Sequence, residues 1–423
     1  MNYEVIIIGG GMAGLMAAKN LSLRGKKVLV LEAAARFGGR VNTVTDPAFD
    51  TVLEAGAEFI HGDLPLTLGL LNEAAIPFYK TGGEMVNNKN GQWQLMDNEA
   101  EEWSRLFKKM KEIKRDMPLS HFLEKYFPGE KNITLRSSVR HYAEGFDLAD
   151  INTASTIALY NEWSKEEEGL YRVQGGYSRL TQYLVHICEQ NGAALLASCI
   201  VKTIEWKKDE VRVHTVKADV FTGNKVIVTV PLKIVKNKDN ETGAIDFIPA
   251  IPVYIIAAGK IGYGTVIKLF LQFSDAFWVK QSKQPGFIIS DQVIPTWWTQ
   301  LPNRSNMLTG WLGGPNAEAL QNADEKIILR MGLESLANIF SVSIDTLHSL
   351  LRSWKIIDWS AMPFIGGAYS FATIETTAAR KLLKTPLEET VYFAGEGIYE
   401  TDAPGTVEAA LYSGEKIADD MPG

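Results

Sequence analysis

Three glycines near the start of the chain, Gly9, Gly11 and Gly14, have the type and spacing that bind a pyrophosphate. They follow the apolar run Val5–Ile8 and precede an apolar stretch with helical spacing that continues to Leu23. In such a G-x-G-x-x-G pattern the first glycine permits a tight turn. The second lets a pyrophosphate approach the backbone, and the third lets helix and strand pack closely. The N–H groups and dipole at the helix start supply the anion site.

A carboxylate follows at the spacing expected for recognition of a nucleotide ribose. The apolar segment Val28–Leu31 ends at Glu32, eighteen residues after Gly14. A carboxylate in this position accepts hydrogen bonds from an adenosine ribose. Strand, glycine turn, helix, strand and acid in this order predict dinucleotide binding. A glycine-rich turn in an ordinary α/β fold is the alternative interpretation, and it does not explain Glu32.

A second glycine-rich element comes directly after this carboxylate. Gly38 and Gly39 stand between Arg36 and Arg40. The glycines suit another close approach to a cofactor, and the guanidinium groups can hold ribose and phosphate oxygens through charge-assisted hydrogen bonds. A nicotinamide dehydrogenase does not need this element, whereas a flavoprotein with an extended, buried FAD does.

The composition is that of a globular enzyme with a large core. A chain of 423 residues is expected to form two domains, and 46% hydrophobic and 22% charged residues are ordinary values. The longest apolar run, near Ile248 to Ala258, is interrupted by prolines and is too short to cross a bilayer. We therefore expect neither a transmembrane segment nor a signal peptide. A net charge of −7 argues against nucleic acid as a partner and mildly favours cationic ligands.

The cysteines and histidines predict no metal site. Cys188 and Cys199 are the only cysteines, and the six histidines have no metal-ligand spacing. Two cysteines are too few for a disulfide framework and fit a reducing compartment. The expected location is therefore the cytoplasm.

The segment from Glu32 to Arg40 resembles the second FAD fingerprint of the flavin-containing amine oxidases. This family includes monoamine oxidases, polyamine oxidases, L-amino-acid oxidases and flavin-dependent histone lysine demethylases. The resemblance covers Val5 to Ser413, with four motifs in the family's order. It implies an α/β fold in which a Rossmann-like FAD-binding domain of glutathione-reductase-like topology is joined to a mixed α+β substrate-binding domain. The FAD domain would comprise residues 1–63, 171–260 and 386–423, and the substrate domain residues 64–170, mainly helical, and 261–385.

The resemblance also implies which residues hold the FAD. The segment Leu53–Gly62 would pass beside the isoalloxazine ring, Val201 would contact adenine, and Pro231 would end the strand that helps to seat the flavin. Glu396 would hold ribityl and pyrophosphate oxygens. A closing helix would direct its positive end at the flavin edge where negative charge collects on reduction. The expected cofactor-binding residues are Gly9, Gly11, Met12, Ala13, Gly14, Glu32, Ala33, Arg36, Gly38, Gly39, Arg40, Gly56, Ala57, Glu58, Phe59, Val201, Pro231, Gly395, Glu396, Gly405, Thr406 and Val407.

Four residues are candidates for the reacting centre. Lys268 lies in the alternating segment Gly264–Phe273, and a buried lysine needs a reason because an unpaired ammonium is costly to bury. In the family this lysine binds flavin N5 through a water. Tyr369 would form one wall of an aromatic substrate cage, and Thr406, a small residue, would stand in the opposite wall and leave a roomier pocket. His61 would face the substrate, as in polyamine-type members, or serve only structure.

The residue before the cage tyrosine bears on how the flavin is held. Monoamine oxidases attach the flavin to a cysteine at that position, and here it is Ala368. The resemblance therefore implies FAD bound without a covalent bond.

The activity implied by the resemblance is FAD-dependent amine oxidation. A small-molecule amine would pass a hydride equivalent to flavin N5, O2 would reoxidise the flavin to give hydrogen peroxide, and the imine would hydrolyse. Two alternatives are an FAD-dependent desaturase or protoporphyrinogen-oxidase-like enzyme, and a flavin-free protein like the GDP-dissociation inhibitors. The substrate stays open among monoamines, polyamines and amino acids. A polyamine would need acids in the cavity, for which the candidates are Glu58, Glu144 and Glu162. Residues 166–168 are expected to form an exposed acidic turn, with a place beside a cation-accepting cavity as the alternative.

Overall fold

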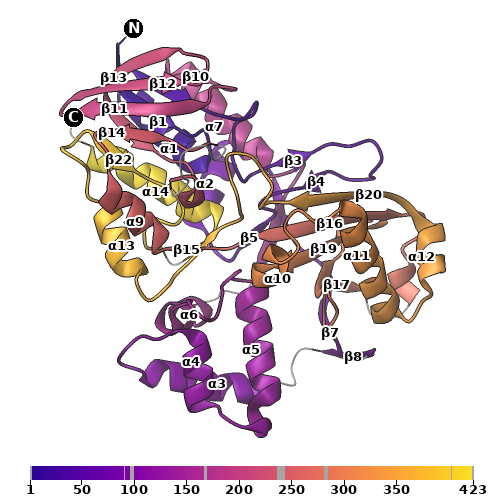
Figure 1. Ribbon diagram of the computed structural model, residues 1–423. Coiled ribbons are helices and arrows are strands. Elements are labelled where there is room, and N and C mark those ends of the chain that lie inside the picture. The colour runs from indigo at the N-terminus through magenta and orange to yellow at the C-terminus, as the bar shows by residue number, and fades with distance from the viewer. Residues whose placement is uncertain are drawn as a thin grey trace.

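The computed structural model describes residues 2–89, 91–95, 100–165, 169–235, 243–280, 284–401 and 403–421. The chain forms two parts that are each built on a large sheet, and a unit of helices lies at the bottom of the view in Figure 1. The predicted acidic turn at residues 166–168 falls outside the described ranges.

The first part contains an eight-stranded sheet whose strands come from three distant stretches of the chain. Its order is β10-β2-β1-β13-β12-β11-β14, and β22 pairs with β13. The central strand β1 runs parallel to β2 and to β13, and its apolar residues are buried as expected for a parallel strand covered on both faces. The strands are β1 (Asn2–Ile8), β2 (Val28–Leu31), β10 (Ala194–Leu196), β11 (Val201–Lys207), β12 (Glu210–Thr215), β13 (Val220–Val228), β14 (Asp246–Ile248) and β22 (Val391–Phe393).

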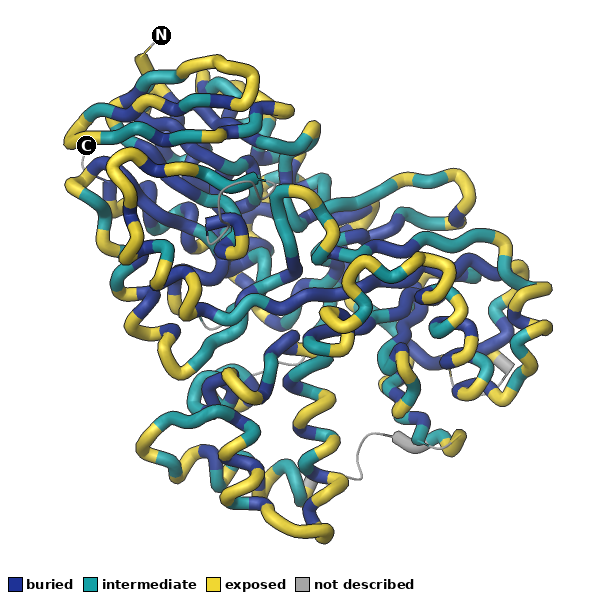
Figure 2. The backbone as a smooth tube through the Cα atoms, viewed as in Figure 1, coloured by how far each residue is buried: buried dark blue, intermediate teal, exposed yellow. Residues whose placement is uncertain are grey.

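Successive side chains of a strand point to opposite faces of the sheet. Because the side chains of β1 are apolar on both faces, helices cover both. Val5 and Ile7 share one buried cluster with residues of α1, α7 and α14. Ile6 and Ile8 belong to another, with residues of α9 and α13. In Figure 2 the dark blue, buried stretches of the backbone tube run through the interior of this part. The helices are α1 (Met12–Leu23), α7 (Ser178–Gln190), α9 (Pro252–Gly259), α13 (Thr376–Leu383) and α14 (Val407–Asp420).

The glycine turn between β1 and α1 is as tight as the spacing predicts. Gly9 has a φ of +107°. A Cβ added at Gly14 would overlap the Gly9 carbonyl oxygen, and one at Gly414 would overlap the Ala13 carbonyl oxygen. Glycine is therefore required both for the turn and for the close packing of α1 on α14.

The second part contains a seven-stranded sheet of order β20-β16-β19-β18-β17-β7-β8. Every residue of β16 is buried, and its neighbours β19 and β20 are both antiparallel to it. The helix α11, which begins after its N-cap Asp324, packs with α12 on one face of this sheet. The elements are β7 (Glu84–Lys89), β8 (Gln92–Leu95), β16 (Val266–Phe273), β17 (Pro285–Ser290), β18 (Thr296–Trp298), β19 (Met307–Gly313), β20 (Leu351–Asp358), α11 (Glu325–Phe340) and α12 (Ile344–Leu350).

The helical unit has a small core of its own, which includes Leu106, Phe122 and Val139. It consists of α3 (Ala100–Glu112), α4 (Leu119–Tyr126), α5 (Ile133–Gly145) and α6 (Thr156–Trp163). Outside it, a three-stranded sheet of order β5-β9-β6 brings residues near 60 and 172 together. The other strands and α-helices are β5 (Phe59–His61), β6 (Phe78–Lys80), β9 (Leu170–Val173), α2 (Pro65–Glu73), α8 (Leu232–Val235), α10 (Gly314–Glu318) and the short pairs β3 (Thr43–Val44) with β4 (Leu53–Glu54) and β15 (Gly262–Tyr263) with β21 (Ser370–Phe371).

The architecture is the expected α/β fold with a Rossmann-like first part and a mixed second part. The strands of the first sheet all fall in the ranges predicted for the FAD domain, and those of the second sheet in the ranges predicted for the substrate domain. Helix α13 lies in a substrate-domain range, yet its Ala379 and Leu383 pack in the first core. Among the described residues no single helix is long and apolar enough to cross a membrane; α11 and α12 pass that test only as a pair bent by 113°.

Candidate active site

One continuous cavity of about 2270 Å³ joins the glycine turn of the first part to the second sheet and the helical unit. This exceeds the roughly 300–1,000 Å³ of most small-ligand pockets, so it has room for a large cofactor together with a second molecule. Its lining includes nearly all of the predicted site residues. Gly14 is the exception, because it faces the Gly9 backbone and Thr229 instead.

The dinucleotide end of the cavity is organised around Glu32. Its Oε2 accepts a hydrogen bond from Gly10 N and its Oε1 one from Ala34 N, each at 2.7 Å. Burial raises the pKa of Glu32, and these two hydrogen bonds oppose the shift. The carboxylate therefore ties the glycine turn to the end of β2 and also lines the cavity where a ribose is predicted.

The two arginines of the second fingerprint bind protein oxygens. Arg36 donates to the carbonyls of Gly39 at 2.7 Å and Val41 at 3.0 Å. Arg40 donates to Glu396 Oε1 at 2.7 Å and to the Ala368 carbonyl at 2.6 Å. Arg40 thus connects the second fingerprint to Glu396, 356 residues later in the chain. Contacts from either arginine to cofactor oxygens stay a prediction.

The backbone at this end fits an extended dinucleotide. Gly11, the N-cap of α1, makes no side-chain cap hydrogen bond, so the N–H groups at the helix start are available to an anion. Gly38 N donates to Gly10 O at 2.8 Å, which brings the two glycine-rich segments side by side. A Cβ at Gly395 would meet nothing within 4 Å, so this glycine borders open space. Thr406 caps α14, accepting from Ala409 N at 3.2 Å.

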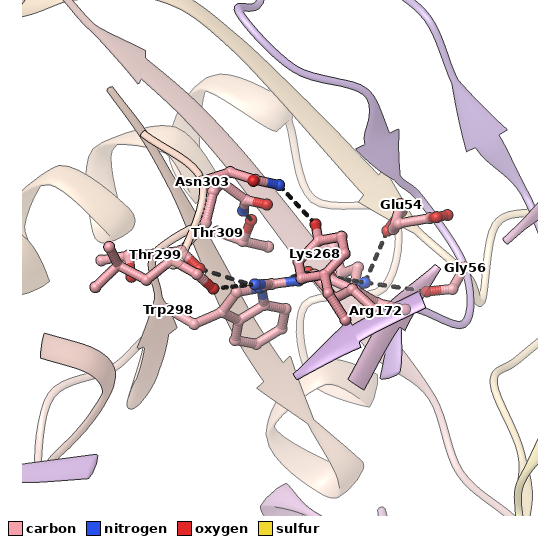
Figure 3. A network of polar contacts seen from close by, with 12 residues as sticks. Glu54, Gly56, Arg172, Lys268, Trp298, Thr299, Asn303 and Thr309 are labelled. Atoms are coloured by element: carbon pink, nitrogen blue, oxygen red, sulfur yellow. Dashed lines mark hydrogen bonds and ion pairs between the residues drawn. The ribbon is translucent and has the colours of Figure 1, made fainter. Parts of the chain in front are cut away.

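Lys268 lies where the first and second parts meet, on the fully buried strand β16. Its side chain is 1% exposed. The ammonium donates to the carbonyls of Glu54 at 2.7 Å and Gly56 at 3.0 Å, and to Glu58 Oε2 at 3.0 Å (Figure 3). An ammonium has three N–H donors, and all three are used here. A water linking Lys268 to a flavin would have to share one of these donors, and that link stays a prediction.

Glu58 is the acid that compensates the charge of the buried lysine. Its Oε1 accepts from Arg172 Nε at 3.1 Å and from Trp298 Nε1 at 2.9 Å. Burial raises the pKa of Glu58, but the combined effect of Lys268 and Arg172 lowers it by more, so the net shift is downward. Arg172 also donates to the carbonyls of Thr299 and Leu301. One carboxylate and two cations therefore form a paired, hydrogen-bonded cluster, as buried charges require.

Aromatic rings line the substrate side of the cavity in an unbroken series of contacts. Ring centroids are 5.5 Å apart for Phe59–Trp298, 6.2 Å for Phe59–His61 and 5.7 Å for His61–Phe146. Tyr142 stacks on Phe146 at 5.3 Å. Burial lowers the pKa of His61 to about 4, so this histidine is neutral near pH 7 and does not repel a cation.

Tyr369 connects this aromatic wall to the cofactor end. Its hydroxyl donates to the Phe146 carbonyl at the end of α5. A Cβ at Gly405 would lie 3.0 Å from Tyr369 Cδ2, so the ring covers the residue next to Thr406. Burial raises the pKa of Tyr369, and the nearby carboxylates of Asp147 and Glu162 raise it further. Both acids also line the cavity.

One face of α5 lines the outer part of the cavity. The residues at this face recur at helical spacing and are mostly uncharged and polar: Ile133, Thr134, Ser137, Ser138, His141, Tyr142 and Gly145. A helix of 13 residues is about 20 Å long. The cavity therefore extends well beyond the reacting centre, which suits a substrate with a chain.

The sequence analysis missed several residues of this site. Arg172 and Trp298 hold Glu58, while Phe146 and Asp147 border Tyr369. The unusual burial of charge at Lys268 was the one available signal, since it required a partner. Of the three acids predicted for a polyamine, Glu162 lines the cavity, Glu58 is engaged by two cations, and Glu144 pairs with Arg140 at 4.0 Å. Within the described ranges, no group of three or more His, Cys, Asp or Glu side chains can hold a metal.

Comparison with known proteins agrees with this geometry. A family model described as "Flavin containing amine oxidoreductase" matches residues 12–422. The chain is 27% identical over 454 residues to mouse (Mus musculus) lysine-specific histone demethylase 1B, covering 99% of this chain and 52% of that protein. It is 25% identical over 498 residues to bovine (Bos taurus) peroxisomal N(1)-acetyl-spermine/spermidine oxidase, covering 98% and 94%. The chain thus spans about half the length of the histone demethylases that it matches.

Solved structures share the fold. Putrescine oxidase bound to putrescine superposes with a TM-score of 0.81 at 19% identity, covering 99% of both chains. Cyclohexylamine oxidase from Brevibacterium oxydans IH-35A also gives 0.81 at 19%, covering 100% of this chain and 99% of that one.

Proposed function

The chain belongs to the family of flavin-containing amine oxidoreductases, and from this premise we propose that it is an FAD-dependent amine oxidase. The observation that carries the proposal is the single cavity that runs from the glycine turn, past Lys268 and Tyr369, to the aromatic wall. Bound FAD would accept a hydride equivalent from the carbon that bears an unprotonated amine, with O2 as the final acceptor and water hydrolysing the imine. The family match favours this activity over the desaturase-like and flavin-free alternatives.

The side chains of the cavity suit an amine next to the cofactor. Neutral His61 and the rings of Phe146 and Tyr369 form an apolar surface with hydrogen-bonding edges. Such a surface lowers the cost of holding an amine in its uncharged form, because burial disfavours the ammonium. Glu58 offsets the charge of Lys268, which weakens the repulsion between the buried lysine and a cationic substrate.

We further propose that the substrate is a diamine or polyamine. Asp147 and Glu162 line the cavity beside Tyr369 and can attract a second ammonium group. The polar face of α5 gives a chain about 20 Å in which to extend. The names of a spermine/spermidine oxidase and of a structure with putrescine bound support the same class.

The test is peroxide release by the purified flavoprotein across monoamines, diamines, polyamines and amino acids. We expect the highest kcat/KM with diamines or polyamines. A matched pair of variants then probes the acids: Glu162→Gln should raise KM for a diamine more than for a monoamine of the same length, whereas Glu144→Gln should change neither. If the flavin-loaded protein releases no peroxide with any of the amines tested, amine oxidation is refuted. A preference for amino acids would refute only the substrate class.

A further inference from the structure

A second, smaller cavity adjoins the Lys268 cluster. It has a volume of about 280 Å³, and its polar lining includes Glu54, Glu58, Tyr79, Arg172, Gln300 and Asn303. We call it the rear chamber. Two lining residues, Asn303 and Gln174, are exposed, so the chamber reaches the surface. A polar space of this size holds several water molecules. Glu58 lines both this chamber and the main cavity.

The two carboxyl groups of the rear chamber are in different states. Glu58 is ionised because it pairs with two cations. Glu54 Oε1 accepts from Tyr177 N at 2.6 Å and its Oε2 accepts from Thr43 Oγ1 at 2.9 Å. Burial raises the pKa of Glu54 to about 7, and the Glu58 charge adds to this shift.

The charged and titratable groups around Glu54 come from separate segments of the chain; one of them is Tyr177, whose N–H binds Glu54 and whose pKa is raised chiefly by burial. Glu58, before β5, raises its pKa, while Lys268, on β16, lowers it. Arg172 on β9 and Tyr79 on β6 face it across the chamber. Burial raises the pKa of Tyr79, and the charges of Glu58 and Glu54 contribute to the shift. The phenol therefore stays protonated, and its hydroxyl can donate a hydrogen bond into the chamber.

Lys268 itself is badly placed to exchange a proton. Each of its three N–H groups has an oxygen partner, so loss of one proton would leave one buried oxygen without its donor. Glu54 has no such restriction. When the Glu54 carboxyl is ionised, Thr43 Oγ1 donates a hydrogen bond to it; when the carboxyl is protonated, it can donate to Thr43 Oγ1 instead. The exchangeable proton of the cluster thus belongs to Glu54.

Amine oxidation by O2 requires a proton at each half of the cycle. The substrate ammonium loses one proton before its C–H bond breaks and two electrons leave with that hydrogen. O2 then takes up the two electrons, that hydrogen and one further proton to become H2O2. The overall reaction, R–CH2–NH3⁺ + O2 + H2O → R–CHO + NH4⁺ + H2O2, balances only if the proton lost in the first half is returned in the second.

We propose that the rear chamber exchanges protons between solvent and Glu54, and that the charge of Glu54 is coupled electrostatically, through the Lys268–Glu58 pair, to the cofactor side of the main cavity. The chamber does this while the substrate occupies the main cavity. The use of the proton in reducing O2 rests on the proposed function. The proton exchange itself requires only that flavin binds, and it can be measured without an amine.

The first test is the pH dependence of the flavin midpoint potential, measured by spectroelectrochemical titration of the holoprotein. For a two-electron couple, each coupled proton contributes about 30 mV per pH unit. Negative charge gained on reduction would favour protonation of Glu54, which couples one further proton to the two electrons. The wild-type midpoint potential should therefore fall by about 60 mV per pH unit between pH 7 and 8.5. Glu54→Gln keeps both hydrogen bonds but cannot ionise, and its slope should stay near about 30 mV.

Glu334→Gln, the same change at an exposed helix position, is the matched control and should follow the wild type. Equal slopes in wild type and Glu54→Gln would overturn the role of Glu54.

The second variant is Tyr79→Phe, which removes the hydroxyl that accepts from Asn303 Nδ2 at 2.8 Å. Reoxidation by O2 in stopped flow should slow at least threefold at pH 8, with a larger solvent isotope effect. An unchanged rate and isotope effect would overturn the chamber as the route, whatever the behaviour of Glu54→Gln.

Discussion

Lys268 and Glu58 form an ion pair of 3.0 Å in which the two side chains are only 1% and 4% exposed. The residues are 210 positions apart, one on the buried strand β16 of the second sheet and the other on the segment before β5. Their pairing joins the cofactor part to the substrate part at the reacting end of the cavity. Arg172 and Trp298 both donate to the other oxygen of Glu58, Oε1, so each oxygen of the buried carboxylate is hydrogen bonded.

Lys268→Met should destabilise the protein by about 3–5 kcal/mol, because it leaves a buried carboxylate with one cation fewer. The double variant Lys268→Met/Glu58→Gln should lose less than the sum of the two single variants, since no uncompensated charge remains on Glu58. Urea unfolding of all four proteins measures this coupling. Strictly additive losses would show that the pair is energetically independent.

Glu54→Gln should change stability in a pH-dependent way. The folded pKa of about 7 lies above the ordinary value of 4.5, so the contribution of Glu54 is fully present below about pH 4.5 and is lost as the pH rises through 7. The amide that replaces the carboxyl group in this variant never ionises. The stability of the variant relative to wild type should therefore improve between pH 5 and 8, by on the order of 3 kcal/mol. A pH-independent difference in unfolding free energy would contradict the assignment.

Tyr369→Phe should loosen the junction between α5 and the cofactor end. The change deletes the hydroxyl that donates to the Phe146 carbonyl, at a cost of about 1 kcal/mol. We expect faster hydrogen exchange in the last turn of α5 and unchanged flavin content. Tyr412→Phe, at a partly exposed position of α14, is the control. Equal protection of α5 in both variants would argue against the tether.

Glu32→Gln should weaken FAD binding. An amide cannot accept from both Gly10 N and Ala34 N, and its NH2 group would face one of these donors. Loss of a hydrogen bond to a charged group costs about 1.5–3 kcal/mol, which corresponds to roughly 10- to 100-fold in Kd. Calorimetric titration of the apoprotein measures it. Glu4→Gln, where the carboxylate also binds a backbone N–H, should retain wild-type affinity.

The flavin should leave the denatured protein. Ala368 stands where the resemblance implies that a covalent link would form, and it offers no nucleophile. Cys188 and Cys199 are both buried; Cys188 is not among the lining residues of the cavity, and Cys199 lines it with the nearby Val201, the residue expected to contact adenine. After acid precipitation, the yellow colour should remain in the supernatant; a yellow pellet would mean a covalent bond.

The sequence by itself determined the features that depend on neighbouring residues. The glycine turn between β1 and α1 follows from Gly9, Gly11 and Gly14, because a short local pattern specifies both the backbone conformation and the close packing. Glu32 lies at the end of β2 for the same reason. The order of the family's motifs along the chain was sufficient to predict the two-part architecture.

Only the tertiary structure decided which distant side chains meet. Burial of Lys268 predicts a partner, but Glu58 and Arg172 become neighbours through the pairing of β5 with β9 and the approach of β16 to both. The contact of Tyr369 with Phe146 similarly depends on where α5 ends relative to the cofactor part. The raised pKa of Glu54 requires burial beside charges from separate segments. These properties arise from packing between elements far apart in the chain, and no local pattern records them.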